Sequence, residues 1–462
     1  MSNTVLAIDI GSTKVCAIIA EISNTQEVIV EGSGVSKSQG IKKGAIINIE
    51  LASKAIKNAI NDAKRVAGSS ITSATVSISN AYAKSINSKG VVNIPNKEIS
   101  INEINRVIQT ALYNANIPAE YEVIHILPYN FKVDGQDEIE DPYGMNANRM
   151  EVDVNIIISQ KSNLSNLKKA VLSAGVEING VVLSGYASAI ATMNEDEKSL
   201  GVAVIDLGGQ TSNLVIHKGN SIRYNDFLGV GSNHITNDLS MALHTPLQVA
   251  ETVKRDYGNL IETGNEVIEL PMLGDEEKMN AVSLEIVYSV IYARVEETLM
   301  ILAKSLEKSA LKDDIKASII LTGGMTKLKG IRELAQAIFS NMTVRIGYPN
   351  NISGLFEELK DPAFATAVGL LKYKAGQHTQ YEINFEEELL HSKKVSSENL
   401  SDIKIANSST ETKDESITLH QKKKETEKRP VESNISFDDL PNLEDENNNP
   451  IKKMASWARQ LF

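Results

Sequence analysis

One local pattern occurs twice in the sequence, about 200 residues apart: an apolar run, an aspartate, a glycine-containing turn and a second apolar run. The first copy reads A-I-D-I-G-S-T-K-V-C-A-I-I around Asp9, and the second reads A-V-I-D-L-G-G-Q-T-S-N-L-V-I around Asp206. Short apolar runs bounded by turn residues are typical of buried strands. Each copy therefore predicts a β-hairpin with a short polar tip, and two such hairpins in one chain indicate a shared ligand site more strongly than either alone.

The residue types at both tips suit a phosphate ligand. Glycine lets backbone N–H groups approach an anion, hydroxyl groups add donors, and a lysine adds a positive charge. An aspartate at the end of each first strand can hold a hydrated Mg²⁺ between the tips, so Asp9 and Asp206 are the predicted metal residues, acting through water. The candidate binding residues are Asp9, Gly11, Ser12, Thr13 and Lys14 in the first tip and Asp206, Gly208, Gly209, Gln210 and Thr211 in the second.

A third glycine-containing segment, S-I-I-L-T-G-G-M-T-K-L-K-G, contains the candidate binding residues Gly323, Gly324 and Met325. A strand that ends in T-G-G before a helix brings bare backbone close to a flat ligand. An ordinary strand-to-helix turn explains the same residues. This segment therefore indicates a ligand site only in combination with the two hairpin tips.

Composition bounds the class of protein. The 462 residues suggest two to four folding units, and the net charge of -12 argues against nucleic acid as the main partner. A single cysteine, Cys16, excludes an internal disulfide and fits a reducing compartment. The first residues do not read as a signal peptide, and no apolar run approaches the roughly 18 residues of a spanning helix. We expect a cytosolic chain that contacts a membrane only from its surface.

Strand-like and helix-like patterns alternate along the chain before the composition changes. Val5–Ile10, Cys16–Ile22 and Thr75–Ile78 predict strands, and Leu51–Ala67 has helical spacing, which together indicate an α/β architecture. Residues 376–449 hold 17 acidic against 9 basic residues and few aromatics. That composition predicts a disordered linker.

The last thirteen residues, P-I-K-K-M-A-S-W-A-R-Q-L-F, predict a basic amphipathic helix over 450–462. Such a helix buries its apolar face in a membrane surface, in a groove of a partner or against its own globular body, and a membrane surface suits the basic residues and the single Trp best. The predicted membrane residues are Ile451, Lys452, Lys453, Met454, Trp457, Ala458, Arg459, Leu461 and Phe462.

The two tips and the T-G-G turn together resemble the actin-like ATPase superfamily. In that superfamily the two hairpins clasp a triphosphate across a cleft and the T-G-G turn lies against the adenosine, which implies ATP and Mg²⁺ as cofactors. The segment A-E-T-V-K resembles the helix that contacts ribose and adenine, so Glu251 and Lys254 are candidates, although an i,i+3 surface pair explains them nearly as well. Gly231 matches a further superfamily glycine near the phosphates.

Within the superfamily, three features resemble the FtsA family of bacterial division proteins. The phrase D-P-Y-G-M-N-A-N-R-M is similar to a stretch of that family's inserted subdomain. The phrases V-R-I-G-Y-P-N-N-I-S-G-L and T-A-V-G-L-L closely match the family's run after the adenosine motif. The tail ending in an amphipathic helix is the third. The implied fold is α/β and actin-like, with two domains of duplicated mixed sheets flanked by helices, an inserted α+β subdomain and a disordered tail. The predicted segments are a first domain at 1–83 and 163–200, the insertion at 84–162, a second domain at 201–375, the linker at 376–449 and the helix at 450–462.

The resemblance also implies a function. FtsA proteins bind ATP, polymerise on the cytoplasmic face of the inner membrane at the division septum, and anchor FtsZ there through a face of the second domain. They contact later septal division proteins through the inserted subdomain, here residues 84–162. We therefore expect a peripheral membrane protein of the divisome that forms filaments with itself. Two alternatives from the same superfamily remain, a type IV pilus assembly ATPase and a small-molecule kinase, but neither explains the terminal helix.

Two departures from the superfamily pattern bear on hydrolysis. Gln210 stands where many relatives have a third glycine, and its side chain either crowds the γ-phosphate or orients a water. Hydrolysing members also carry a Gln or Glu on the helix before the second hairpin, whereas this chain offers only Ser184, Tyr186 and Ser188 there. We therefore predict at most a slow ATPase, in which ATP acts mainly as a conformational ligand, and assign no catalytic residue.

Overall fold

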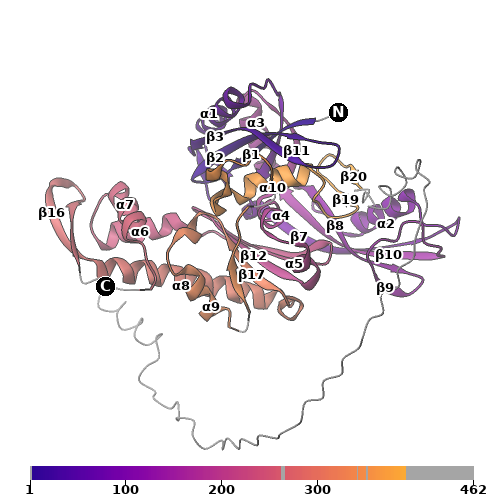
Figure 1. Ribbon diagram of the computed structural model, residues 1–462. Coiled ribbons are helices and arrows are strands. Elements are labelled where there is room, and N and C mark those ends of the chain that lie inside the picture. The colour runs from indigo at the N-terminus through magenta and orange to yellow at the C-terminus, as the bar shows by residue number, and fades with distance from the viewer. Residues whose placement is uncertain (1–2, 262–265, 341, 350–351, 392–462) are drawn as a thin grey trace, which may run out of the picture. The chain divides into compact units, whose positions relative to one another are not determined.

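The computed structural model describes residues 3–261, 266–340, 342–349 and 352–391, and its elements are shown in Figure 1. Two five-stranded sheets share one topology, in which three antiparallel strands continue into two parallel ones. The first sheet has the order β3 (Val28–Lys37), β2 (Lys14–Ile22), β1 (Asn3–Ile10), β6 (Ser73–Ile78) and β11 (Glu177–Leu183), and the second has the order β14 (Ser221–Leu228), β13 (Ser212–Lys218), β12 (Val202–Leu207), β17 (Ser318–Thr322) and β18 (Val344–Ile346). The predicted hairpins, β1–β2 and β12–β13, are confirmed and occupy equivalent places.

Helices cover the faces of both sheets. The first sheet packs against α1 (Ile49–Ala67) and α3 (Lys161–Ser173). The second sheet shares a core with α8 (Leu284–Lys308) and α9 (Ile331–Ile338), while α4 (Ser184–Thr192) contacts strands of both sheets. Helix α1 starts where the Asn48 side chain accepts a hydrogen bond from the Leu51 N–H, and it ends at Gly68, whose φ of 64° only glycine adopts at little cost. Buried side chains on one face, including Ile56 and Ile60, hold it to the sheet.

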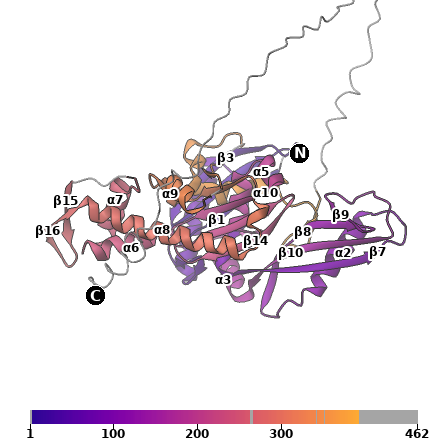
Figure 2. The ribbon, with the colours of Figure 1, turned by 90° about the horizontal axis from the view of Figure 1, so that it is seen from below.

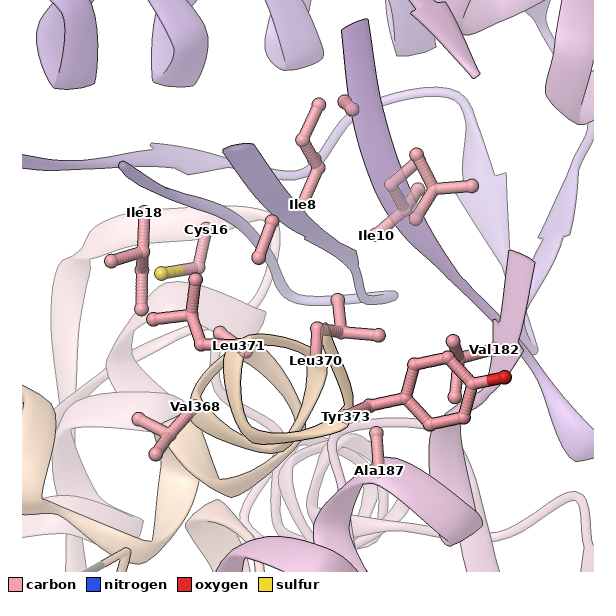
Figure 3. Packing of buried hydrophobic residues seen from close by; sticks show 14 of the residues in the cluster. Ile8, Ile10, Cys16, Ile18, Val182, Ala187, Val368, Leu370, Leu371 and Tyr373 are labelled. Atoms are coloured by element: carbon pink, nitrogen blue, oxygen red, sulfur yellow. The ribbon is translucent and has the colours of Figure 1, made fainter. Parts of the chain in front are cut away.

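The last helix of the part that the structure describes belongs to a different core from the one that we predicted. We predicted helix α10 (Ala365–Lys374) in the second domain, but it packs between β1 and α4 in the first core, and Figure 3 shows Leu371 on the side of the β1–β2 hairpin to which Cys16 and Ile18 point. The crossing with α4 is close, since a Cβ at Gly369 would lie 1.8 Å from the Ala187 carbonyl oxygen. The chain therefore returns to its first half, and the predicted second-domain boundary at 375 is wrong for this helix.

The segment predicted as an insertion forms a sheet with a core of its own. Its elements are β7 (Ala83–Asn93), α2 (Ile101–Asn114), β8 (Tyr121–Val133), β9 (Gln136–Ile139) and β10 (Arg149–Gln160). Figure 2 shows α2 lying over the face of β7 and β10. The helix begins with a capping box, in which Glu103 accepts from the Ser100 backbone N–H.

Residues 376–391, predicted as the start of the linker, are structured instead. They form β19 (Glu382–Ile383), which pairs with β8, and β20 (Leu389–Leu390). The fully buried Glu382 carboxylate accepts hydrogen bonds from His125 Nδ1 (2.7 Å), Tyr373 Oη (2.7 Å) and Tyr186 Oη (3.0 Å). Three donors satisfy a buried carboxylate, so the linker prediction is wrong as far as residue 391. The rest of that prediction, and the helix predicted over 450–462, lie outside the described residues.

The remaining elements surround these layers. They are β4 (Ile41–Lys42), β5 (Ala45–Ile46), α5 (Glu195–Leu200), α6 (Ser232–Ala242), α7 (Leu247–Tyr257), β15 (Val267–Met272) and β16 (Asp275–Ser283), with short 3-10 turns that include η3 (Gly324–Lys327). Among the helices of the described part of the chain, none is long and apolar enough to cross a bilayer.

Candidate functional site

A cavity of about 740 Å³ lies between the two hairpin tips. Fourteen of the sixteen residues predicted to bind nucleotide line it, and only Gln210 and Gly231 do not. The fourteen are Asp9, Gly11, Ser12, Thr13, Lys14, Asp206, Gly208, Gly209, Thr211, Glu251, Lys254, Gly323, Gly324 and Met325. Residues that are more than 300 positions apart in the sequence therefore meet around one space, whose size suits a small-molecule ligand.

The first tip presents side chains to this cavity. The Gly11 N–H donates to the Lys14 carbonyl (3.1 Å) and closes the turn, and the Ser12 hydroxyl accepts from the Gly44 N–H (2.9 Å). Because Ser12 Oγ accepts there, its own proton is available to donate to a ligand. The Lys14 ammonium lies 3.2 Å from the centroid of the Phe364 ring, and burial lowers its pKa. This tip supplies a hydroxyl group and a positive charge.

The second tip presents mainly backbone, and helix α6 holds that backbone in place. The N–H groups of Ser232 and Asn233, at the start of α6, donate to the carbonyls of Gly208 (3.0 Å) and Gly209 (2.7 Å). Gly231 lies directly behind, since a Cβ there would be 2.5 Å from the Gly208 carbonyl oxygen. Gly231 therefore supports the tip without lining the cavity, which is a different role from the predicted one.

Two half-buried aspartates, Asp9 and Asp206, both line the cavity. Burial raises the pKa of Asp9. A hydrogen bond from Ser77 Oγ (2.9 Å) and the charge of Lys14 lower it, but the effect of burial is larger. Burial, and then the charge of Asp9, raise the pKa of Asp206 to about 6. Two desolvated carboxylates that repel each other favour a cation between them.

The donor set fits a hydrated Mg²⁺ held jointly with phosphate. Within the described residues no group of three or more His, Cys, Asp and Glu side chains is arranged to hold a metal ion. Asp9 and Asp206 alone would supply too few ligands for Mg²⁺, which normally keeps several waters and takes further oxygens from substrate phosphates. The pair therefore suits a metal that arrives with a phosphorylated ligand.

The T-G-G turn comes close to the second aspartate. Gly323 has a φ of 88°, and a Cβ there would lie 2.4 Å from Asp206 Oδ1, so the position requires glycine on both counts. The turn continues into the short 3-10 segment η3, whereas we predicted a helix at this point; α9 follows only at Ile331. Bare backbone at Gly323 and Gly324 lines the cavity, as the sequence predicted.

Helix α7 contributes the predicted pair Glu251 and Lys254. The Lys254 ammonium is 2.6 Å from Glu251 Oε2 and 2.8 Å from Thr236 Oγ1, and the whole residue is only 7% exposed. Its third donor reaches the Ser232 carbonyl (3.3 Å). The two residues thus form an i,i+3 pair, but a largely buried one that ties α7 to α6 and presents Glu251 to the cavity.

Sequence reasoning missed about half of the lining. The further residues are Ile10, Gly44, Ser79, Ser184, Asn213, Ser232, Arg255, Asp256, Gly258, Lys327, Leu328, Ala363 and Thr366. Asn213 is the most informative, because it is 5% exposed, pairs with Asp206 across the hairpin, and its Oδ1 has no hydrogen-bond partner within the described residues. Its place two residues after Thr211 on the return strand could have indicated it.

The helix before the second hairpin offers little to a reacting water. Ser184 Oγ donates to the Ile78 carbonyl (2.6 Å), and the Tyr186 hydroxyl donates to Glu382. Ser188 Oγ lies 3.1 Å from the Gly185 carbonyl and is also hydrogen-bonded to Asp206, where it lowers the pKa of that carboxyl. Only Ser184 lines the cavity. The Asn213 amide, which also lines the cavity, lies opposite Asp206 on the return strand and not on this helix.

Comparisons with known proteins agree with these observations. The family profile described as "Cell division protein FtsA" matches residues 203–369, and the profile described as "SHS2 domain inserted in FTSA" matches residues 80–158. The chain is 41% identical over 409 residues to the cell division protein FtsA of Helicobacter pylori (strain ATCC 700392 / 26695), covering 82% of this chain and 83% of that protein. It is 30% identical over 391 residues to that of Escherichia coli (strain K12), covering 83% and 93%.

A solved structure shows the same fold at low sequence identity. A chain of the structure titled "PilM-PilN type IV pilus biogenesis complex" matches with a TM-score of 0.58 and 17% identity, covering 80% of this chain and 98% of that chain. That likeness concerns the fold alone, which is actin-like. The identity to curated relatives over most of both chains, together with the matching insertion and two-sheet cleft, shows that the chain belongs to the FtsA family of cell division proteins.

Proposed function

We propose that the chain is an ATP-binding division protein that polymerises on the cytoplasmic face of the inner membrane, anchors FtsZ filaments at the septum and helps recruit later divisome proteins. The observation that carries the nucleotide part is the single cavity that two hairpin tips, the T-G-G turn and α7 share. Lys14 and the tip N–H groups would hold the phosphates, and Asp9 and Asp206 would hold Mg²⁺ through water. Gly323, Gly324 and Met325 would lie against the adenosine.

Photo-crosslinking tests this placement of the nucleotide. The full chain is irradiated with 8-azido-ATP and Mg²⁺, and the labelled peptides are identified by mass spectrometry. We expect label within Glu251–Gly258 or Gly323–Leu328, and we expect excess ATP to remove it. Label that resists ATP, or that falls on surfaces away from the cavity, would contradict the proposed site.

Hydrolysis is proposed to be slow, with ATP serving mainly to stabilise a closed, polymer-competent state. Helix α4 carries no Gln or Glu; Ser184 and Tyr186 are hydrogen-bonded to Ile78 and Glu382, and Ser188 is bonded to the Gly185 carbonyl and to Asp206. Positioning a water is a large part of phosphoryl-transfer catalysis. We expect phosphate release well below about one turnover per second, which is slow on the enzyme scale. Faster turnover, measured with purified full chain and Mg²⁺, would contradict the proposal.

Membrane attachment is proposed to reside in residues 450–462, on the basis of their sequence. One amphipathic helix binds weakly and reversibly, whereas many copies on a filament bind by avidity. Flotation with anionic liposomes should therefore recover the intact chain and not a chain ending at Asn449, with more recovered when ATP is present. Trp457→Glu should release the protein while ATP binding persists. Equal flotation of intact and shortened chains would refute the membrane role of this segment.

The proposed FtsZ contact lies on a face of the second half of the chain. The hairpin β15–β16 packs at the end of α6, where the Leu273 N–H donates to the His244 carbonyl (2.7 Å). Several apolar side chains of this region are exposed, among them Met241, Leu273 and Met279. Exposed apolar surface of this kind suits a protein partner.

Co-sedimentation with FtsZ polymers tests this face. Leu273→Glu, with Met279→Glu as a second variant, should lower the amount of chain that sediments with FtsZ. Leu172→Glu, at a similarly exposed leucine on α3, is the matched control. The proposal fails for this face if the two hairpin variants sediment with FtsZ as the control does. Contact with later division proteins is assigned to residues 84–162 on family grounds alone.

A further inference from the structure

The turn between β4 and β5 contacts both hairpin tips at once. Its two residues, Lys43 and Gly44, have φ values of 49° and 78°, so the chain reverses tightly and presents two successive N–H groups. The Gly44 N–H donates to Ser12 Oγ in the first tip (2.9 Å). The Lys43 N–H donates to Gln210 Oε1 in the second tip (2.8 Å). One turn in the first half of the chain is thereby bonded to the tips of both halves.

In the second tip, N–H groups of α6 bond the backbone, whereas the Gln210 side chain makes the contact with the turn. The carbonyls on either side of the tip are fixed by N–H groups of α6, and Gly231 packs against the tip backbone. The side chain is half-buried, does not line the cavity, and extends instead to the β4–β5 turn. This geometry supports neither of the two consequences that we considered for Gln210, crowding of a phosphate or orientation of a water.

A second contact between the tips lies beside the first. A Cβ at Gly209 would be 1.7 Å from Thr13 Oγ1, so the Thr13 side chain sits directly against the bare Gly209 backbone. The two tips are thus in contact at Thr13 and Gly209, and an oxygen acceptor on the side chain at position 210 adds a bond from the second tip to the β4–β5 turn. A glycine at position 210 would offer no such acceptor.

We propose that Gln210 and the β4–β5 turn form a latch that holds the two sides of the cleft together around a bound nucleoside triphosphate. The inference rests on the proposed nucleotide function and deepens it, because it assigns Gln210 to closure and not to phosphate contact. Opening the cleft to release nucleotide requires the hydrogen bond between the Lys43 N–H and Gln210 Oε1 to break. Gln210 is therefore a positioning residue that sets how long the loaded state lasts.

The matched variants separate the hydrogen bond from packing. Gln210→Met keeps the length of the side chain and removes the oxygen acceptor, while Gln210→Ala removes both. Gln109→Met makes the same chemical change on the exposed face of α2, away from the cavity. Release of N-methylanthraniloyl-ATP from the full chain is followed after a chase with excess ATP. We expect release about fivefold faster in Gln210→Met, the size of effect typical of one hydrogen bond, with Gln109→Met unchanged.

The separation of the two sides provides a readout that does not depend on release rates. Spin labels at Lys57→Cys on α1 and Gln248→Cys on α7 report the distance across the cleft, since both positions are exposed. The native Cys16 is fully buried, and burial raises the pKa of its thiol to about 12, so it does not compete for label. With Mg²⁺ and ATP we expect one short distance in the parent chain and an added longer population in Gln210→Met.

The outcomes distinguish the latch from the function on which it rests. If the parent chain binds ATP and Gln210→Met matches it in release rate and distance, the latch is overturned and nucleotide binding stands. If the parent chain binds no ATP, both proposals fail together. Faster release with a longer distance in Gln210→Met and Gln210→Ala, but not in Gln109→Met, supports the latch.

Discussion

The two hairpin tips occupy equivalent strands of two sheets with the same topology, yet they contribute different things to the cavity. The first tip offers the Ser12 hydroxyl and the Lys14 ammonium, whereas the second offers backbone whose carbonyls are bonded to α6. The duplication has kept the strand order and the aspartate in each copy, but not the chemistry of the tip. One side of the cleft supplies a positive charge and a side-chain hydroxyl, and the other supplies mainly backbone and, in our proposal, a means of closure.

The largest expected effect lies in the shape of the second tip. Gly231→Ala places a Cβ 2.5 Å from the Gly208 carbonyl oxygen and 2.8 Å from the Gln210 nitrogen, both of them backbone atoms, and α6 holds the first of them by a hydrogen bond. We expect a loss of about 2 kcal/mol in unfolding free energy and of all measurable ATP binding. Gly11→Ala in the first tip meets one backbone oxygen, at 2.9 Å, and should be milder. Denaturant unfolding and ATP titration measure both variants. Equal effects of the two substitutions would contradict the claim that the second tip depends more on its backbone shape than the first.

The next largest effect concerns the charge of the first tip. Lys14→Met should weaken ATP binding about thirtyfold, because a charge-assisted hydrogen bond to phosphate is lost. Lys327→Met is the comparison variant, since Lys327 also lines the cavity but forms an ion pair with Asp361 (2.5 Å). Equilibrium titration measures both affinities. A loss at Lys327 as large as that at Lys14 would mean that the first tip is not the main source of positive charge.

A smaller effect, with two readouts, is expected at the second aspartate. We expect Mg²⁺ to raise the ATP affinity of the parent chain about tenfold, and we expect Asp206→Asn to abolish that gain because one of the two carboxylates is lost. It should also raise the melting temperature of the nucleotide-free chain, because burial and the Asp9 charge disfavour the ionised side chain. Affinity measured with and without Mg²⁺, together with thermal melts, checks this. Unchanged Mg²⁺ dependence would remove Asp206 from the metal site.

The smallest effect is expected at the hydroxyl of the second tip. Thr211→Val should weaken ATP binding only about threefold, since backbone donors dominate on that side and one neutral hydrogen bond is worth little. Ser12→Ala, in the first tip, should weaken ATP binding more than Thr211→Val does, because the Ser12 hydroxyl also accepts a hydrogen bond from the Gly44 N–H in the β4–β5 turn. Side-by-side titration of the two variants is the check, and the reverse order would contradict the division of roles between the tips.

The sequence predicted the parts of the fold that rest on local patterns. Apolar runs and glycines in the sequence predict both hairpins and the T-G-G turn. The family resemblance predicted that these three segments lie around one cavity. The sequence did not predict that α10 returns to the first core, because the local pattern of Ala365–Lys374 does not indicate which sheet the helix covers. Strands β19 and β20 were missed because two-residue strands carry no periodicity and lie in a polar, acidic stretch.

The contacts of single side chains were the hardest to predict. In the sequence, Gln210 only departs from the glycine-rich pattern of its loop. The residue that donates a hydrogen bond to it, Lys43, is 167 residues away in the chain. Glu382 reads as part of an acidic linker, yet donors from β8, α4 and α10 surround it. Both cases depend on tertiary neighbours that a local sequence pattern does not contain.

The central claim is that the two tips build one Mg²⁺-dependent ATP site, and calorimetric titration of the full chain with ATP tests it most directly. The account predicts one saturable site per chain in the presence of Mg²⁺, weakened in Lys14→Met and insensitive to Mg²⁺ in Asp206→Asn. No saturable heat in the parent chain, or binding that neither substitution changes, would contradict it.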